Sequence, residues 1–167
     1  MKTYSNTSTH KFRSSEYICK GMVWALLFGL YLSSAERMSA VDKGYFIGNW
    51  MNVDPQTRGL KAMQIGLQDN QMLMLAWGAC HPNPCTWGQA RVSLLAPGVS
   101  SSDVSAGTAV YKTSFAIRRL TIRPARHRTL EVEVMTHFID NSGRSDYTNT
   151  ERFRSVAWSE WDPNIFR

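Results

Sequence analysis

The chain has 167 residues, enough for one domain with its own hydrophobic core but too few for two. Its composition is 43% hydrophobic and 19% charged, which excludes an intrinsically disordered protein. The formal net charge is +6, but residues 1–40 hold five Lys and Arg against two Glu, so the remaining residues carry only +3. A charge of that size gives no indication of nucleic-acid binding.

The first 40 residues have the pattern of an export signal. A polar segment ending at Lys20 precedes an apolar run over residues 21–32, and residues 33–35 and 38–40 offer cleavage sites for a signal peptidase. Twelve helical residues extend about 18 Å, short of the ~30 Å hydrocarbon core of a membrane. We predict a signal peptide and short leader over residues 1–40, and a secreted or periplasmic domain over 41–167 with no stable membrane insertion after cleavage. An uncleaved membrane anchor and a cytosolic protein are the alternatives.

Beyond residue 44, apolar residues recur with a period of two between turn residues, which is typical of β-strands. Residues 71–79 are apolar on both faces, so we expect this strand to be central or covered by another element. At Arg118-Arg119 the alternation slips by one residue, which predicts a bulge or a tight turn. Eight strands are predicted, at residues 45–53, 60–68, 71–79, 89–95, 108–117, 120–123, 129–139 and 147–156.

Cys80 and Cys85 lie between two predicted strands, in the segment from Trp77 to Gly88. An exported protein meets an oxidising compartment, which favours a disulfide between these two cysteines. A loop this short gains about 2 kcal/mol from a cross-link by the chain-entropy argument, less what its two prolines already restrict. A metal site with His81 as third ligand is the alternative, but neighbouring Cys80 and His81 rarely face one ion. Free thiols are the other alternative. We predict the disulfide and no metal.

Eight consecutive strands joined mostly by short turns have two common solutions. An up-and-down barrel closes the sheet and removes its edges, whereas a sandwich leaves edges to protect. We therefore predict an all-β protein, an eight-stranded antiparallel up-and-down barrel. An interior of that size is filled by side chains or holds one small ligand. The predicted inward side chains are bulky, which favours a filled interior: Met63, Met72, Met74, Tyr111, Phe115, Val132, Val134 and Phe138.

Gly48-Asn49-Trp50, near the start of the first predicted strand, resembles the Gly-x-Trp signature of lipocalins and their calycin relatives, including avidins and bacterial metalloprotease inhibitors. The resemblance implies a lipocalin- or avidin-like barrel whose floor is closed by Trp50. It also implies that the tryptophan stacks under an arginine near the last strand, for which Arg152 and Arg154 are the candidates.

A second resemblance covers a longer stretch. The segment from Trp77 to Gly88 is similar to one found in small exported bacterial proteins that carry Trp-Gly-x-Cys-His-Pro-x-x-Cys-x-Trp-Gly. Residues 52–59, which read Asn-Val-Asp-Pro-x-Thr-Arg-Gly, extend the likeness over most of the mature chain. The resemblance supports export but implies no activity.

Catalytic motifs are lacking in the mature sequence. None of His81, His127 and His137 lies in a hydrolase, metalloprotease or phosphate-binding motif. Glu131 and Glu133 share one face about 7 Å apart, a pairing that glycosidases use but that is more often solubilising charge. We therefore predict that the protein is not an enzyme and needs no cofactor.

Five arginines between residues 118 and 128 form a basic strip. Outward-facing Arg119 and Arg123 would stand beside Glu131 and Glu133 of the next strand, and each cross-strand charge pair contributes about 0.2–1 kcal/mol. This structural interpretation accounts for much of the strip. Contact with anionic lipid, lipopolysaccharide or an acidic partner is the functional alternative.

The sequence favours a binding protein whose barrel holds a small apolar or amphipathic ligand. Aromatic rings near a barrel mouth, here Trp77 and Trp87, suit such a ligand, and they also suit packing around a disulfide. A protein-interaction module, such as a secreted protease inhibitor, is the alternative, and we expect no nucleic-acid partner. The candidate ligand-binding residues are Trp50, Arg58, Trp77, His81, Trp87, Tyr111 and Arg152.

Overall fold

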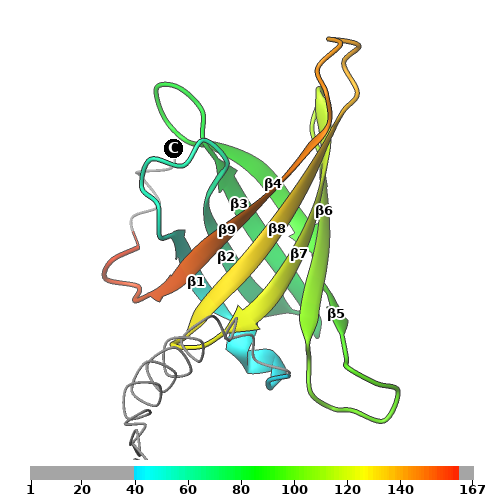
Figure 1. Cartoon of the computed structure of the whole chain (residues 1–167). Coiled ribbons are helices and arrows are strands. Elements are labelled where there is room, and N and C mark those ends of the chain that lie inside the picture. The colour runs from blue at the N-terminus through cyan, green and yellow to red at the C-terminus, as the bar shows by residue number, and fades with distance from the viewer. Residues whose placement is uncertain (1–39, 162–167) are drawn as a thin grey trace, which may run out of the picture. The chain divides into compact units, whose positions relative to one another are not determined.

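The computed structural model describes residues 40–161 of the protein (Figure 1). Nearly all of the predicted signal peptide and leader, residues 1–39, therefore lies outside the described residues. The described part consists of one short 3₁₀ helix and nine β-strands. They are η2 (Lys43–Phe46), β1 (Gly48–Asn52), β2 (Leu60–Gln68), β3 (Gln71–Gly78), β4 (Cys85–Arg91), β5 (Ser93–Leu95), β6 (Ala106–Lys112), β7 (Ala116–Ala125), β8 (Thr129–Phe138) and β9 (Tyr147–Val156).

The strands form one antiparallel sheet in the order β4-β3-β2-β1-β9-β8-β7-β6-β5. β1 pairs with β2 on one side and with the last strand, β9, on the other, so the sheet curls back on itself. β4 and β6 then lie beside each other across the seam of a nearly closed up-and-down barrel (Figure 1). The predicted all-β class and antiparallel barrel are therefore confirmed.

The number of strands differs from the prediction, because the single strand expected at residues 89–95 is divided into β4 and β5. β4 begins earlier, at Cys85, and pairs with β3, whereas β5 pairs with β6. Val92 lies at the division, where its N–H donates to the carbonyl of Met72 at 2.8 Å. Alternation could not reveal this change of partner, since Ala90 and Val92 are both buried and keep the same phase.

The hairpin between β6 and β7 also differs from the prediction. The chain turns at residues 113–115, where Thr113 N–H donates to the carbonyl of Ala116 at 2.9 Å. β7 then pairs with β8 in one continuous register over its whole length. The predicted slip at Arg118-Arg119 is therefore wrong. Arg118 has the same phase as Ala116 and Leu120, and it points into the barrel.

The core fills the barrel toward one end, called here the closed end, which η2 and the β7–β8 turn cover (Figure 1). Large side chains from η2 and six strands meet there without contact with solvent. The fully buried ones include Phe46, Trp50, Met63, Met74, Leu120, Ile122, Leu130, Val132 and Phe153. Most predicted inward positions are confirmed, but Phe115 is 37% exposed because it lies in the β6–β7 turn.

Trp50 is fully buried in the floor of the barrel. Its Nε1–H donates to the carbonyl of Phe46 at 2.8 Å, which ties η2 to β1. The arginine over its ring is Arg128 of the β7–β8 turn, 5.2 Å from the ring centroid, and not Arg152 or Arg154. Both β9 arginines are exposed on the outer face, because Ser155 is the β9 residue opposite Trp50 and they have the other phase.

A second, smaller apolar cluster lies on the outer face of the sheet. Trp161 of the C-terminal segment packs with Ala62 and Val156, and its ring centroid is 5.4 Å from that of Trp77. This contact covers the outer face of β3, the strand predicted to need cover. Within residues 40–161, no helix is both long enough and apolar enough to cross a membrane.

Candidate functional site

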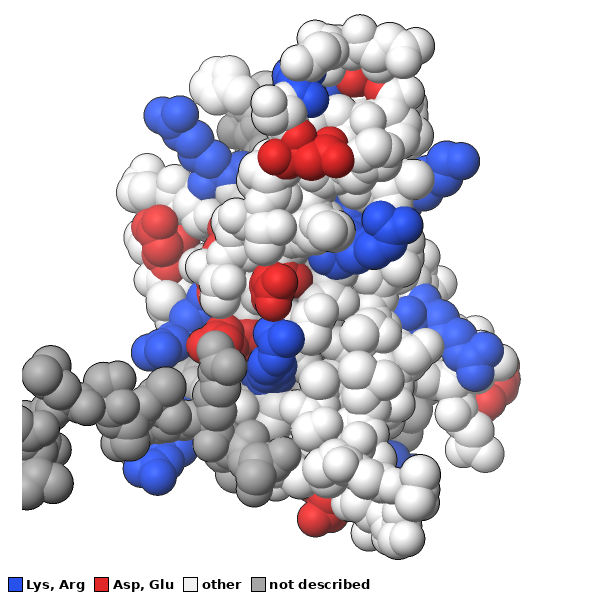
Figure 2. All heavy atoms as spheres, turned by 45° about the vertical axis from the view of Figure 1, so that its right-hand side comes forward, with Lys and Arg blue, Asp and Glu red and all other residues white. Residues whose placement is uncertain are grey.

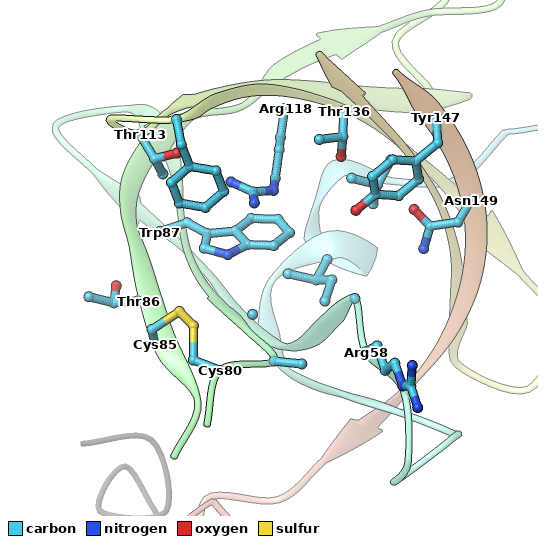
Figure 3. A pocket seen from close by; sticks show the side chains of 16 residues that line it. Arg58, Cys80, Cys85, Thr86, Trp87, Thr113, Arg118, Thr136, Tyr147 and Asn149 are labelled. Atoms are coloured by element: carbon cyan, nitrogen blue, oxygen red, sulfur yellow. A yellow bond between two sulfur atoms is a disulfide. The ribbon is translucent and has the colours of Figure 1, made fainter. Parts of the chain in front are cut away.

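The end of the barrel opposite η2, called here the open end, contains a cavity of about 280 Å³ (Figure 3). The cavity lies where β2, β4, β7 and β9 begin and β3, β6 and β8 end. The Cys80–Cys85 disulfide, with Cα atoms 5.5 Å apart, forms part of the wall and confirms the predicted pairing. The side chains that face the cavity include Leu60, Trp87, Phe115 and Val134, which are apolar, and Arg58, Arg118, Thr136, Tyr147 and Asn149, which are polar.

A row of polar side chains crosses four neighbouring strands just inside the open end. The strand register sets Tyr111 of β6 opposite Arg118 of β7, Arg118 opposite Thr136 of β8, and Thr136 opposite Tyr147 of β9. Directly opposed residues of antiparallel strands point to the same face, with Cβ atoms about 4.5–5.5 Å apart. The row therefore forms one polar layer, and Figure 3 shows Arg118, Thr136 and Tyr147 along one side of the cavity.

Arg118 is the most unusual residue of this layer, because its side chain is charged and only 9% exposed. Its guanidinium lies 4.5 Å from the ring centroid of Trp87 and 5.0 Å from that of Phe115. Burial lowers the pKa of Arg118, but an arginine stays protonated at neutral pH. Its buried Nη1 has no hydrogen-bond partner among the described residues. The cavity therefore contains a positive charge with a free donor.

Thr136, the direct neighbour of Arg118 on β8, is 1% exposed, and its buried Oγ1 also lacks a partner among the described residues. Tyr111 differs, because its hydroxyl donates to the carbonyl of Met74 at 2.7 Å. That bond connects β6 to β3 across the seam, and burial raises the pKa of the Tyr111 hydroxyl. The two unpartnered polar atoms of the layer thus belong to facing residues of β7 and β8.

A β-bulge positions Trp87 in the cavity. The register between β3 and β4 shifts between Ala76 and Trp77, so Trp87 is an extra residue on its strand. Gly88 follows with a φ of 88°, a left-handed conformation that favours glycine. The indole packs directly over Gly78, where a Cβ atom would lie 2.2 Å from Trp87 Nε1. Glycine at position 78 is therefore what leaves room for the ring.

Hydrogen bonds to Glu151, an inward-facing residue of β9, hold one part of the rim of the cavity. Glu151 accepts from Thr57 Oγ1 at 2.5 Å and from the N–H of Leu60 at 3.0 Å, which fixes the β1–β2 loop. This loop carries Arg58, which lies on the far side of the cavity from Arg118 (Figure 3). The one inward-facing carboxylate of β9 is thus used in holding the rim.

The β8–β9 loop completes the rim. Its Arg144 forms an ion pair with Asp140 and stacks 3.9 Å from the centroid of Phe138. His137 Nδ1 lies 2.7 Å from a carboxylate oxygen of Asp146, and this contact holds the pKa of Asp146 below its usual range. Arg144 and Asp146 thus each have a partner within the hairpin itself.

The charge inside the cavity contrasts with the outer surface. None of the described side chains that line the cavity is an aspartate or a glutamate, while two are arginines. On the face shown in Figure 2, basic and acidic side chains are interspersed. The predicted basic strip is likewise divided: Arg123 pairs with Glu133 at 3.2 Å on the outer face, whereas Arg118 lies inside and Arg128 covers the floor.

The structure brings only part of the predicted site together. Arg58 and Trp87 line the cavity, and Tyr111 packs against Trp87 with ring centroids 5.8 Å apart. The other candidates lie elsewhere. Trp50 is in the floor, Trp77 packs on the outer face, His81 is exposed in the disulfide loop, and Arg152 is exposed on β9.

Sequence reasoning missed Arg118 and Thr136 as site residues. The available signal for Arg118 was its phase, since it is two residues before Leu120 and four before Ile122, which are both buried. The predicted slip removed Arg118 from that series. Thr136 continues the inward phase of Val132 and Val134 in the same way.

The cavity offers hydrogen-bond donors beside an apolar wall, an arrangement suited to holding a molecule with one polar end. Among residues 40–161, no three or more His, Cys, Asp or Glu side chains gather as metal ligands would. No family model matches the chain, and searches of curated proteins and of solved structures found no match either.

Proposed function

We propose that this protein is an exported binding protein that holds a small amphipathic molecule in the cavity at the open end of its barrel. The observation that carries the proposal is the cavity itself, about 280 Å³ in volume, with Trp87 and Leu60 on its apolar side and Arg118 and Thr136 on its polar side. Ligand sites typically combine an apolar lining with a few convergent polar groups in this way.

The filled core limits where a ligand can bind and how large it can be. The floor is occupied by Trp50, Met63 and Phe153, so the ligand lies near the mouth and does not extend through the barrel. A volume of 280 Å³ equals that of roughly nine liquid water molecules at ~30 Å³ each. It lies just below the usual range for drug-sized ligands, about 300–1,000 Å³. The ligand is therefore a small molecule, not a long lipid chain.

The chemistry of the lining supports binding, because its apolar wall and its polar side chains can hold the two ends of an amphipathic molecule. The disulfide also supports export, because such bonds persist in oxidising compartments.

Two measurements test the proposal. Native mass spectrometry of the protein from its own source should detect a co-purifying small molecule. In solution, titration with indole, a small neutral probe, should shift the NMR signals of the Trp87 indole N–H and of Val134. Val134→Phe, which fills the cavity, should reduce these shifts, whereas Val110→Phe on the exposed face of β6 should not. The proposal would be contradicted if no molecule co-purified and no NMR signal shifted with the probe.

A protein-interaction module is the second candidate, and one observation favours it. Trp158 is 73% exposed and lines an outer groove of about 300 Å³ with Leu73 and Leu75 of β3. Exposed tryptophans are enriched where proteins bind one another. Cross-linking in the source culture would support this function if one partner were captured by the wild type and lost in Trp158→Ala.

A further inference from the structure

We infer that the ligand of the open-end cavity is a monocarboxylate, whose carboxylate group binds between Arg118 and Thr136; this inference rests on the proposed function. Two buried polar atoms lack partners among the described residues, Arg118 Nη1 and Thr136 Oγ1. Both residues line the same cavity and face each other across β7 and β8.

An unpaired buried charge is costly for the folded protein. A buried polar group without a hydrogen bond destabilises the folded state, and a charged group does so more strongly. The Trp87 and Phe115 rings, 4.5 Å and 5.0 Å from the Arg118 guanidinium, offset part of this cost through cation–π contacts. Aromatic faces accept N–H groups only weakly, so the rings do not replace an oxygen acceptor. An acceptor oxygen would satisfy this donor, and an anionic oxygen would also offset the buried charge.

Electrostatics of the cavity point to the same ligand charge. Arg58 stands on the far side of the mouth, and the described lining contains no carboxylate that could neutralise either arginine. Glu151, the inward carboxylate of β9, already accepts hydrogen bonds from Thr57 and Leu60. An anion entering the cavity therefore meets positive charge that the protein leaves uncompensated.

The donor set distinguishes a carboxylate from a phosphate. A phosphate has three strong acceptor oxygens and close to two negative charges, so it calls for several donors. Here the buried donors without a partner among the described residues are one N–H group of Arg118 and the neighbouring Thr136 hydroxyl, which match the two oxygens of a carboxylate. Arg58 lies on the far side of the mouth. Leu60, Val134 and the Trp87 indole form the apolar wall that would contact the rest of the ligand.

Acids paired with their uncharged amides test this inference. The probes are octanoate and octanamide, benzoate and benzamide, and indole-3-acetate and indole-3-acetamide, with inorganic phosphate as a further anion. By calorimetry and NMR titration of the disulfide-bonded domain, at least one acid should bind tenfold or more tightly than its amide. Phosphate should bind more weakly than that acid.

Substitutions then locate the group that recognises the charge. Arg118→Met should remove the preference of the acid over its amide, and Thr136→Val should reduce it several-fold. Arg119→Met is the matched control, because Arg119 is the next residue on β7 and is exposed on the outer face. It should keep the full preference. Arg118→Lys, which keeps the charge without the planar guanidinium, serves if the Met variant does not fold, and it should bind the acid several-fold more weakly.

Four results would overturn the inference. They are equal binding of every acid and its amide, no binding of any acid, binding of phosphate more tightly than any acid, and a preference that survives in both the Arg118 and Thr136 variants. Equal binding would leave the proposed function intact, since a neutral small molecule would then occupy the cavity. If no acid binds, the indole titration decides whether the proposed function fails as well.

Discussion

Arg118 and Thr136 each bury a polar atom without a partner among the described residues, in a barrel whose other inward positions on β7 and β8 are mainly apolar. Replacing both by apolar residues would remove a desolvation cost from the folded state. Proteins accept such a cost most often at functional sites. This pattern distinguishes the open end from the closed end, where buried side chains are apolar and large.

Thr136→Val tests this interpretation in the protein without ligand. Valine has nearly the shape of threonine, so the substitution removes the unpartnered hydroxyl and leaves the packing unchanged. We expect the free energy of unfolding to rise by up to about 1 kcal/mol, or to stay level, in urea denaturation. Thr121→Val, on the outer face of β7, is the control and should change it little. A loss of 1 kcal/mol or more in Thr136→Val would show that its hydroxyl has a stabilising partner.

Arg128 has a different role, because its guanidinium contacts the backbone and the ring that close the floor of the barrel. It donates to the carbonyls of Tyr45 at 2.6 Å and Ile47 at 3.0 Å, and it stacks over Trp50. Arg128→Met should lower the free energy of unfolding by about 1–2 kcal/mol, because it loses charge-assisted bonds and a cation–π contact. Arg152→Met should stay within about 0.5 kcal/mol of wild type, since Arg152 is exposed on the outer face. Equal effects of the two substitutions would refute this role of Arg128.

At the scale of single strands, the cavity depends on one close approach between neighbouring strands. Trp87 of β4 lies over Gly78 of β3, and its place as the extra residue of the bulge turns its ring inward. The strand pair therefore sets both the wall of the cavity and the ring that covers Arg118.

Gly78→Ala tests this approach. The new Cβ would lie 2.2 Å from Trp87 Nε1, so the indole must move out of its position. We expect a loss of about 1–3 kcal/mol of stability, as for other overpacked sites, and a shift in tryptophan fluorescence. Gly66→Ala on β2 is the matched control, because no atom lies within 4 Å of its new Cβ. It should be neutral or stabilising by up to about 1 kcal/mol. Unchanged fluorescence in Gly78→Ala would contradict the expected displacement.

Side-chain alternation predicted most strands, and the residues that it misplaced show its limits. The period of two identifies which positions are inward but not which strand lies alongside, so the change of partner at Val92 could not be read from it. The turn at residues 113–115 contains neither proline nor glycine, so the irregularity was placed at Arg118-Arg119 instead, and Arg118 was left out of the inward series. The arginine over Trp50 was also missed, since Arg128 lies in a turn, where alternation has no meaning.

At the scale of the whole domain, the barrel is closed between β4 and β6 by side-chain contacts and not by a continuous ladder of backbone hydrogen bonds. β5 pairs with β6 over three residues only, and the ladder does not continue along β4. The Tyr111 hydroxyl, bonded to the carbonyl of Met74, joins β6 to β3 across this gap, and its ring packs against Trp87. Closure of the barrel and formation of the cavity are therefore coupled through the same two rings.

Tyr111→Phe should weaken the seam selectively, because it leaves the ring in place and removes only the buried hydrogen bond. We expect a loss of about 1–2 kcal/mol of global stability, and faster amide exchange in β4 and β6 than in β8 and β9. The dependence of stability on alkaline pH distinguishes the contribution of the Tyr111 hydroxyl from that of its ring packing. Burial raises the pKa of Tyr111 in the folded state, so wild-type stability due to this group is complete below about pH 10 and declines as pH rises further. The difference in free energy of unfolding between wild type and Tyr111→Phe, measured as a function of pH, should isolate that decline. If exchange instead increased equally in all strands, the hydroxyl would stabilise the barrel as a whole and not its seam.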